Sequence, residues 1–250
     1  MRSLLVLAGL VHISLTSAQS VTAEHDVVRD TLTLLDTASQ RTIPIAIYRH
    51  GDKAMDGSPV ILFSHGYNEN KPGTYLLYRW LLEPLVKDGH VVVSVQHELV
   101  GDPPLAMQGD IRAARRPSWE RGVANLAHVL RHLHRTCPQL DLGRLTVMGH
   151  SHGGDISVLF ATEYPDRIQK LITLDNRRLA LPRTVHPRVY SLRSNDQLPD
   201  PGVLPEPEEA KYHHMTLEAP VGIGHNDMGN RGTPAEQQRV LTIVRAWLAE

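Results

Sequence analysis

The segment 149–154, Gly-His-Ser-His-Gly-Gly, limits the possible folds of this chain more than any other part of its sequence. An apolar run at 145–148 precedes it, and a helical pattern follows over about 153–164. Between a strand and a helix, Gly-x-Ser-x-Gly requires a sharp turn that exposes the serine hydroxyl at the carboxyl end of the strand. Gly149 and Gly153 leave room for the strand and the helix to approach each other. The segment therefore predicts an α/β fold in which Ser151 is a candidate nucleophile.

The rest of the chain alternates between short apolar runs and helical patterns. Two β-rich segments, 26–35 and 41–48, come first and are expected to pair antiparallel. Buried strands are expected at 60–63, 91–95, 145–148, 171–174 and 189–192, with a last strand near 215–221. Helices are expected over about 74–87, after a cap at Ser118, over 153–164, and after the capping box that begins at Thr233. This alternation is typical of a mostly parallel central sheet with helices on both faces.

A serine nucleophile needs a base and an orienting acid, which on such a sheet follow it in the order acid, then histidine. His225 is the expected base, because its glycine-rich loop between the last strand and the last helix can reach over the sheet edge. Two aspartates compete for the role of acid. Asp196, just after the strand at 189–192, is favoured over Asp175, which closes the strand at 171–174, and Asp200 is a third option.

Acyl transfer also needs backbone N–H groups that stabilise the oxyanion of the tetrahedral intermediate. The loop after the strand at 60–63 contains Gly66, which lets the backbone turn, followed by Tyr67. The N–H of Tyr67 and that of His152, at the start of the helix after Ser151, are the expected oxyanion donors.

These segments together resemble the α/β-hydrolase family. The resemblance rests on His-Gly-Tyr at 65–67, the segment at 149–153, the acid region at Asp196, and His225 near the end. Within the family the chain looks like the cap-poor branches: dienelactone hydrolases, cutinase-like polyester hydrolases and platelet-activating-factor acetylhydrolases. The first two branches favour Asp196, whereas the third carries its acid in a Leu-Asp context like the one at Asp175.

The resemblance implies a serine hydrolase that cleaves carboxylic esters through an acyl-enzyme, without a cofactor. A peptidase or amidase with the same triad is the alternative, followed by a non-catalytic binding protein on the same scaffold. Dehalogenase chemistry is disfavoured, because its nucleophile would be an aspartate where this chain has Ser151.

Two arginines, Arg177 and Arg178, follow the strand at 171–174 in a loop expected to rim the site. Planar guanidinium groups suit a carboxylate or phosphate on a substrate, and the alternative is that they pair with acidic side chains at the surface. The connection from this strand to the one beginning near Arg188 is short. We therefore expect a shallow, open site without a large lid.

Composition excludes several other functions. The 250 residues include 26 basic and 27 acidic side chains, and the formal net charge of −1 argues against nucleic acid or an anionic membrane as the main partner. A single cysteine, Cys137, excludes an internal disulfide framework and a zinc site built from several thiolates. We expect a small-molecule ester as the substrate and no metal, and the sequence indicates no oligomeric state.

The first 18 residues have the features of an export signal. Met1-Arg2 supplies one positive charge, an apolar run extends from Leu4 to Leu15, and small residues end at Ala18. The run is too short to span a bilayer as a stable helix. We therefore expect a signal peptide at 1–18, a single domain at 19–250, and export to the periplasm or the medium.

Overall fold

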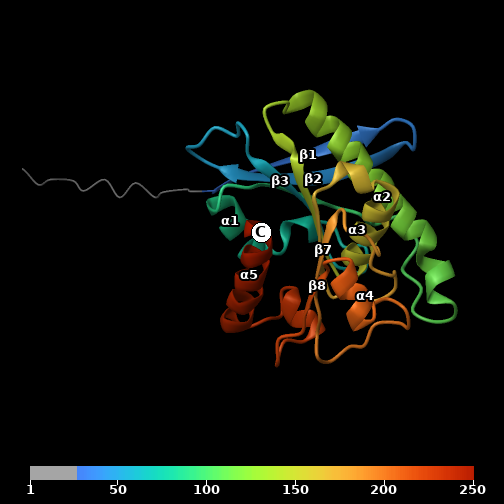
Figure 1. The fold of residues 1–250 in the computed structure, drawn as a ribbon. Coiled ribbons are helices and arrows are strands. Elements are labelled where there is room, and N and C mark those ends of the chain that lie inside the picture. Colours follow the sequence, from blue (N-terminus) through green and yellow to red (C-terminus); the bar gives the residue numbers. More distant parts are fainter. Residues whose placement is uncertain (1–26) are drawn as a thin grey trace, which may run out of the picture.

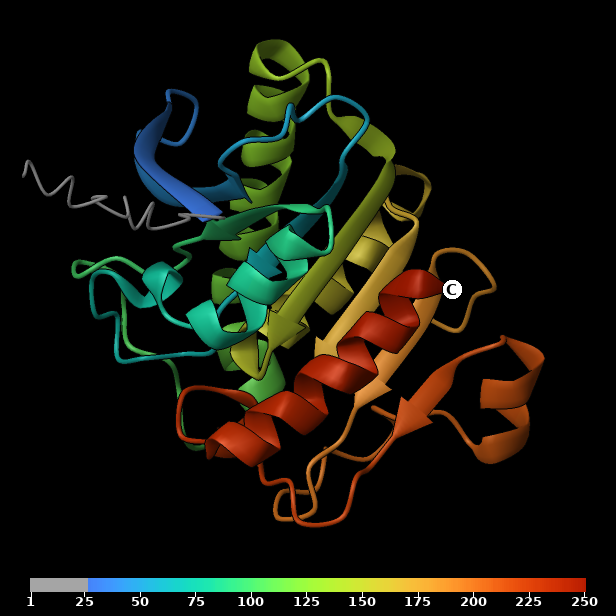
Figure 2. The ribbon, with the colours of Figure 1, turned by 90° about the vertical axis from the view of Figure 1, so that its left-hand side faces the viewer.

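The computed structural model describes residues 27–250, which form one sheet covered by helices on both faces (Figures 1 and 2). The strands are β1 (Val27–Asp36), β2 (Arg41–His50), β3 (Pro59–Ser64), β4 (Val91–Val95), β5 (Asp141–His150), β6 (Lys170–Leu174), β7 (Arg188–Leu192) and β8 (Thr216–Glu218). The helices are α1 (Arg79–Lys87), α2 (Ile111–Thr136), α3 (His152–Glu163), α4 (Pro207–Tyr212) and α5 (Pro234–Ala249). Short 3-10 helices are η1 (Thr74–Leu76), η2 (Pro165–Arg167) and η3 (His225–Met228).

The sheet has the order β1-β2-β4-β3-β5-β6-β7-β8. β1 pairs antiparallel with β2, and β2 pairs antiparallel with β4. All pairs from β4 to β8 are parallel. The predicted α/β fold, with a mostly parallel sheet and antiparallel first strands, is confirmed. β3 and β5 are neighbours in the sheet, but the next strand after β3 lies on one side of this pair and the next strand after β5 lies on the other. This is the switch point of the sheet, where α/β proteins bind their ligands.

Two hydrophobic cores flank the sheet. On one face, α2 and α3 pack against the strands, and the predicted helical positions Trp119, Val123 and Leu126 are all buried there. On the other face lie α1 and α5, where Val240 and Trp247 are buried (Figure 1). The two layers of helices thus bury both faces of the sheet, and the loops at its carboxyl edge are left to form a site.

Two predicted helices differ from the observed ones. The pattern at 74–87 is divided into η1 and α1, because Tyr78 between them has a positive φ of 65°. α2 does not begin at Ser118 but at Ile111, where the side chain of Asp110 accepts a hydrogen bond from the backbone N of Ala113 and caps the helix. Ser118 is buried within the helix. The capping box at Thr233 is confirmed.

The short connection from β6 to β7, residues 175–187, holds no helix, so in the described part of the chain no large lid covers the sheet edge there. Within 27–250 there is also no helix with the length and hydrophobicity needed to cross a bilayer. The predicted signal peptide at 1–18 lies outside the described residues.

Candidate active site

Ser151 lies at the turn between β5 and α3 with a strained backbone, φ 54° and ψ −118°. Its backbone N donates to the carbonyl of Leu174 at the end of β6, at 2.9 Å. A side chain on Gly149 would place its Cβ 2.2 Å from the carbonyl O of Gly153, and one on Gly153 would lie 2.3 Å from the carbonyl O of Ser64. Both glycines are therefore required by close backbone approach, and the predicted sharp turn is present.

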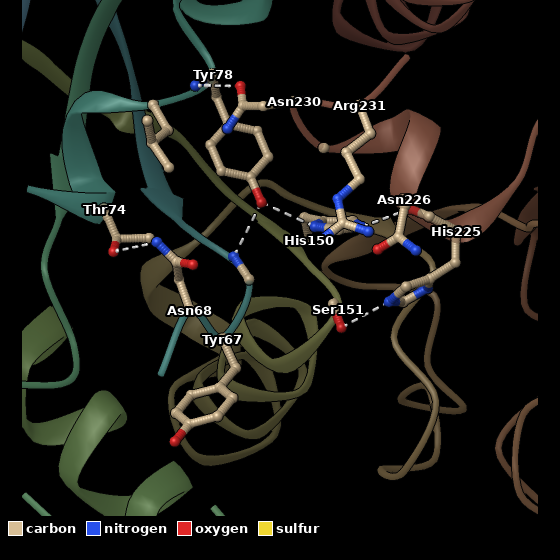
Figure 3. Close-up of a pocket in the computed structure, with 13 residues that line it drawn as sticks. Tyr67, Asn68, Thr74, Tyr78, His150, Ser151, His225, Asn226, Asn230 and Arg231 are labelled. Carbon is tan, nitrogen blue, oxygen red and sulfur yellow. Dashed lines mark hydrogen bonds between the residues drawn. The ribbon is translucent and has the colours of Figure 1, made fainter. Parts of the chain in front are cut away.

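His225, the expected base, faces this serine. Its loop follows β8, and the residue begins η3. The Nε2 atom lies 2.9 Å from Ser151 Oγ, and the side chain is buried (Figure 3). The hydroxyl and the imidazole are thus within hydrogen-bond distance, which is the geometry for proton transfer.

The carboxylate that contacts the His225 ring belongs to Asp175, not to the favoured Asp196. Asp175 Oδ2 lies 2.5 Å from His225 Nδ1, whereas Asp196 Oδ1 accepts a hydrogen bond from the backbone N of His225 at 2.7 Å. The placement of Asp196 against the ring is therefore corrected. The physical reason is sheet order: β6 is the direct neighbour of β5, so the residue after β6 lies next to the turn at Ser151.

Asp175 is fully buried and held from several sides. Ser194 donates to it through its backbone N at 3.1 Å and its Oγ at 2.7 Å, and Arg193 Nη2 lies 3.0 Å from Oδ1. Burial alone would raise the pKa of Asp175, but the hydrogen bond with His225, the charge of Arg193 and the Ser194 hydroxyl hold that pKa below its ordinary value. An ionised Asp175 accepts from His225 Nδ1–H, which leaves Nε2 free to accept the serine proton.

A second chain of hydrogen bonds connects the loop after β3 with the loop of the base. Gly66 N donates to Tyr78 Oη at 3.1 Å, and Tyr78 Oη lies 2.9 Å from His150 Nδ1. His150 Nε2 lies 2.9 Å from the carbonyl O of His225, so Nε2 carries the hydrogen and Nδ1 accepts from Tyr78. Burial lowers the pKa of His150 to about 3 and raises that of Tyr78 to about 12, so both are neutral. Neutral, fully paired side chains thus fix two loops of the site relative to each other.

The expected oxyanion residues have their side chains engaged away from Ser151. Tyr67 Oη accepts from the backbone N of Leu105 at 3.2 Å. The His152 ring accepts from Trp119 Nε1 at 3.1 Å and lies 3.0 Å from Glu98 Oε1. Burial would raise the pKa of Glu98, but the hydrogen bond with His152 and the nearby histidines lower it to about 2. For both residues only the backbone N–H remains for a role at Ser151.

A pocket of about 230 Å³ opens at the Ser151–His225 pair. Its walls come from the loop after β3, from η1 and Tyr78, and from the loop after η3 (Figure 3). The lining includes Tyr67 and Asn68 on one side and Asn226, Asn230 and Arg231 on the other. The pocket is small and mostly polar, so it fits a small substrate.

Arg177 and Arg178, predicted to bind the substrate, do not lie in the pocket at Ser151. Arg178 forms an ion pair with Asp200. The cation in the pocket is Arg231, which the sequence analysis did not single out, although it lies only six residues after His225. Tyr78 was also missed, because nothing in its local sequence indicates that its hydroxyl reaches His150.

A serine, a histidine and a buried carboxylate thus lie in one hydrogen-bonded line at the switch point of an α/β sheet. The family model for the alpha/beta hydrolase fold matches residues 59–202, more than half of the chain. The protein therefore belongs to the α/β-hydrolase family, as the sequence analysis expected.

Known proteins similar to this chain are hydrolases. A haloalkane dehalogenase of Mycolicibacterium paratuberculosis is 26% identical over 164 residues, which are 64% of this chain and 48% of the relative, so the match spans about half of the relative's length. A protein of Klebsiella pneumoniae described as a dienelactone hydrolase is 16% identical, with a TM-score of 0.62 over 90% of this chain and 99% of that one. A fungal esterase from Rhizomucor miehei is 17% identical, with a TM-score of 0.65 over 92% and 84%.

Proposed function

We propose that the protein is a serine hydrolase of small carboxylic esters, with Ser151 as nucleophile, His225 as general base and Asp175 as the acid that orients His225. The observation that carries the proposal is the unbroken line from Ser151 Oγ through His225 to Asp175, with contacts of 2.9 and 2.5 Å. Fold likeness to esterases agrees with this proposal but does not by itself assign an activity.

In the proposed reaction, Ser151 Oγ attacks the ester carbonyl carbon while His225 Nε2 takes the hydroxyl proton. The tetrahedral intermediate collapses, the bond to the alcohol oxygen breaks, and His225 returns the proton to the leaving alcohol. Water then attacks the acyl-enzyme with His225 again as base, and the carboxylic acid leaves as Ser151 regains its proton. Asp175 remains ionised and stabilises the positive imidazole ring formed in each half-reaction.

In this reaction the backbone N–H groups of Tyr67 and His152 would donate hydrogen bonds to the oxyanion of each tetrahedral intermediate. Two features support the assignment. Tyr67 lines the same pocket as Ser151, and His152 is the first residue of α3, where backbone N–H groups lack partners within the helix. The hydrogen bond between Gly66 N and Tyr78 fixes the residue next to Tyr67.

The dehalogenase relative does not change the proposed chemistry. Displacement of a halide through an ester intermediate requires a carboxylate nucleophile, and this chain has Ser151 at the turn.

Amide hydrolysis with the same residues would require protonation of a poorer leaving group. Turnover of a p-nitroanilide and of a p-nitrophenyl ester of the same acid therefore distinguishes amide from ester hydrolysis.

The deciding experiment is labelling with a fluorophosphonate probe, together with turnover of p-nitrophenyl acetate. Wild-type protein should be labelled and should hydrolyse the ester, and Ser151→Ala should do neither. Ser39→Ala, in the exposed turn between β1 and β2, is the matched control and should behave as wild type. A folded wild-type protein without labelling would rule out the serine hydrolase and favour a binding protein on this scaffold.

We also propose that residues 1–18 are removed during export. The apolar run and the small residues ending at Ala18 support this. N-terminal sequencing of protein recovered from periplasm and medium should give Gln19 as the first residue, and an intact Met1 in the cytoplasmic fraction would contradict export.

A further inference from the structure

The pocket at Ser151 has an unusual charge balance. None of the residues that line it is an aspartate or a glutamate, and Arg231 is the lining side chain that is permanently charged. Figure 3 shows its guanidinium reaching into the pocket in which Ser151 and His225 lie. A substrate bound in this pocket therefore meets a positive charge with no carboxylate beside it.

Arg231 has an unoccupied guanidinium, unlike Arg178 and Arg193 near the same sheet edge. Arg178 pairs with Asp200, and Arg193 pairs with Asp175. Within residues 27–250, the side chain of Arg231 forms no hydrogen bond and no ion pair. Its five N–H donors are therefore available to a ligand.

The backbone that carries Arg231 is nevertheless fixed. Arg231 N donates to the carbonyl of Asn226 at 3.4 Å, and Gly229 N donates to the same carbonyl at 3.1 Å. Asn230 Oδ1 accepts from Tyr78 N at 3.0 Å, which ties this loop to the opposite wall of the pocket. Only the side chain of Arg231 has to be ordered when a ligand binds, which limits the entropic cost of binding.

The remaining lining restricts the size and polarity of the substrate. Asn68, Thr74 and Asn230 contribute polar groups, and Leu77 is the aliphatic side chain among the lining residues. With about 230 Å³ of space, the pocket offers little apolar surface for a long acyl chain. A short substrate with a polar or charged end fits it better.

We infer that Arg231 is the specificity-determining residue of this site and that the substrates are esters of small dicarboxylic acids, whose free carboxylate pairs with the guanidinium. This inference rests on the proposed ester hydrolysis at Ser151. A planar guanidinium binds a carboxylate through two parallel hydrogen bonds, which fixes orientation as well as adding affinity. With the carboxylate held there, the ester carbonyl at the other end of a short chain is presented to Ser151.

The test compares two methyl esters that differ in charge alone: monomethyl adipate and its primary amide, methyl 5-carbamoylpentanoate. Release of methanol gives kcat/KM for each. Wild-type enzyme should prefer the carboxylate by roughly 10- to 100-fold, the range that one hydrogen-bonded charge supplies. Arg231→Gln should bring the ratio close to one, Arg231→Lys should give an intermediate ratio, and added salt should lower the wild-type ratio.

The ratio is measured within one preparation, so partial misfolding of a variant lowers both rates and leaves the ratio unchanged. Arg135→Gln, an exposed arginine near the end of α2, is the matched control and should keep the wild-type ratio. Equal rates for both esters in wild type, with p-nitrophenyl acetate still hydrolysed, would overturn the inference and leave the proposed function intact. No ester turnover and no fluorophosphonate labelling would overturn both.

Discussion

Arg193 Nη2 lies 3.0 Å from Oδ1 of Asp175, whose other oxygen contacts the His225 ring. The carboxylate that orients the proposed base is therefore shared with a buried guanidinium. Arg193 is fixed in turn by Asn176 Oδ1 at 3.2 Å and Ser191 Oγ at 3.3 Å. The charge of Arg193 helps to hold the pKa of Asp175 below its ordinary value and so keeps this carboxylate ionised.

Replacing Arg193 with methionine should change the pH dependence of catalysis. The charge of Arg193 helps to hold the pKa of Asp175 low, so without it the Asp175–His225 pair should keep its proton to higher pH, and the acidic limb of the kcat/KM profile should move up by about one pH unit. The variant should also lose about 3–5 kcal/mol of unfolding free energy, because a buried carboxylate is left without its cation. Profiles with p-nitrophenyl acetate and urea unfolding measure the two effects. Arg193→Lys should restore part of both, and an unmoved profile would show that Arg193 is only structural.

The two aspartates near His225 should respond differently to the change to asparagine. Asp175→Asn should lower kcat by about 10³- to 10⁴-fold, because an amide no longer holds the reactive tautomer of the ring. Asp196→Asn keeps a carbonyl oxygen to accept from the backbone N of His225, so its kcat should fall less than about tenfold. Turnover of p-nitrophenyl acetate by both variants decides the acid, and a larger loss for Asp196→Asn would contradict the geometry.

Removing the Tyr78 hydroxyl should damage both loops that it connects. In Tyr78→Phe, the Gly66 N–H and His150 Nδ1 lose their partner in a buried setting, which should cost about 2–3 kcal/mol of unfolding free energy. We also expect kcat to fall about tenfold, because Gly66 precedes the proposed oxyanion donor Tyr67. Tyr212→Phe is the control, since that side chain is exposed. Unchanged stability and kcat in Tyr78→Phe would show that the connection is not needed.

Stability should fall steeply in mild acid. Burial lowers the pKa of His97 and of His150 from 6.5 to about 3, so both are neutral in the folded protein. The unfolded chain takes up protons on these residues below pH 6.5, whereas the folded protein does not. Their contribution is complete above that pH and declines as the pH falls toward 3. When the pH falls from 7.5 to 5.5, protonation of His97 and His150 in the unfolded chain should lower the free energy of unfolding by about 3 kcal/mol.

Urea unfolding at several pH values measures this loss. His97→Asn should make the dependence on pH shallower, because one of the protonation sites that contribute to it is gone. The comparison uses slopes rather than absolute stabilities, so the lower overall stability of the variant does not affect it. A flat dependence in wild type would mean that these histidines can be protonated in the folded state.

The local sequence determined the framework and two of the proposed catalytic residues. Ser151 and His225 could be found because each lies in a glycine-containing turn whose place between a strand and a helix can be recognised from adjacent residues. The strands at 91–95, 171–174 and 189–192 were predictable for a similar reason, since fully buried parallel strands are short continuous apolar runs.

Only the tertiary structure decided which aspartate meets the His225 ring. Asp175 and Asp196 both follow parallel strands. The sequence does not show which of these two strands lies closer to Ser151. The order β5-β6-β7 brings Asp175 to the ring and leaves Asp196 to bind the backbone of the base. The roles of Tyr78 and Arg231 were likewise decided by tertiary structure. Hydrogen bonds such as the one from Tyr78 N to Asn230, 152 positions apart, form only when distant loops meet over the sheet edge.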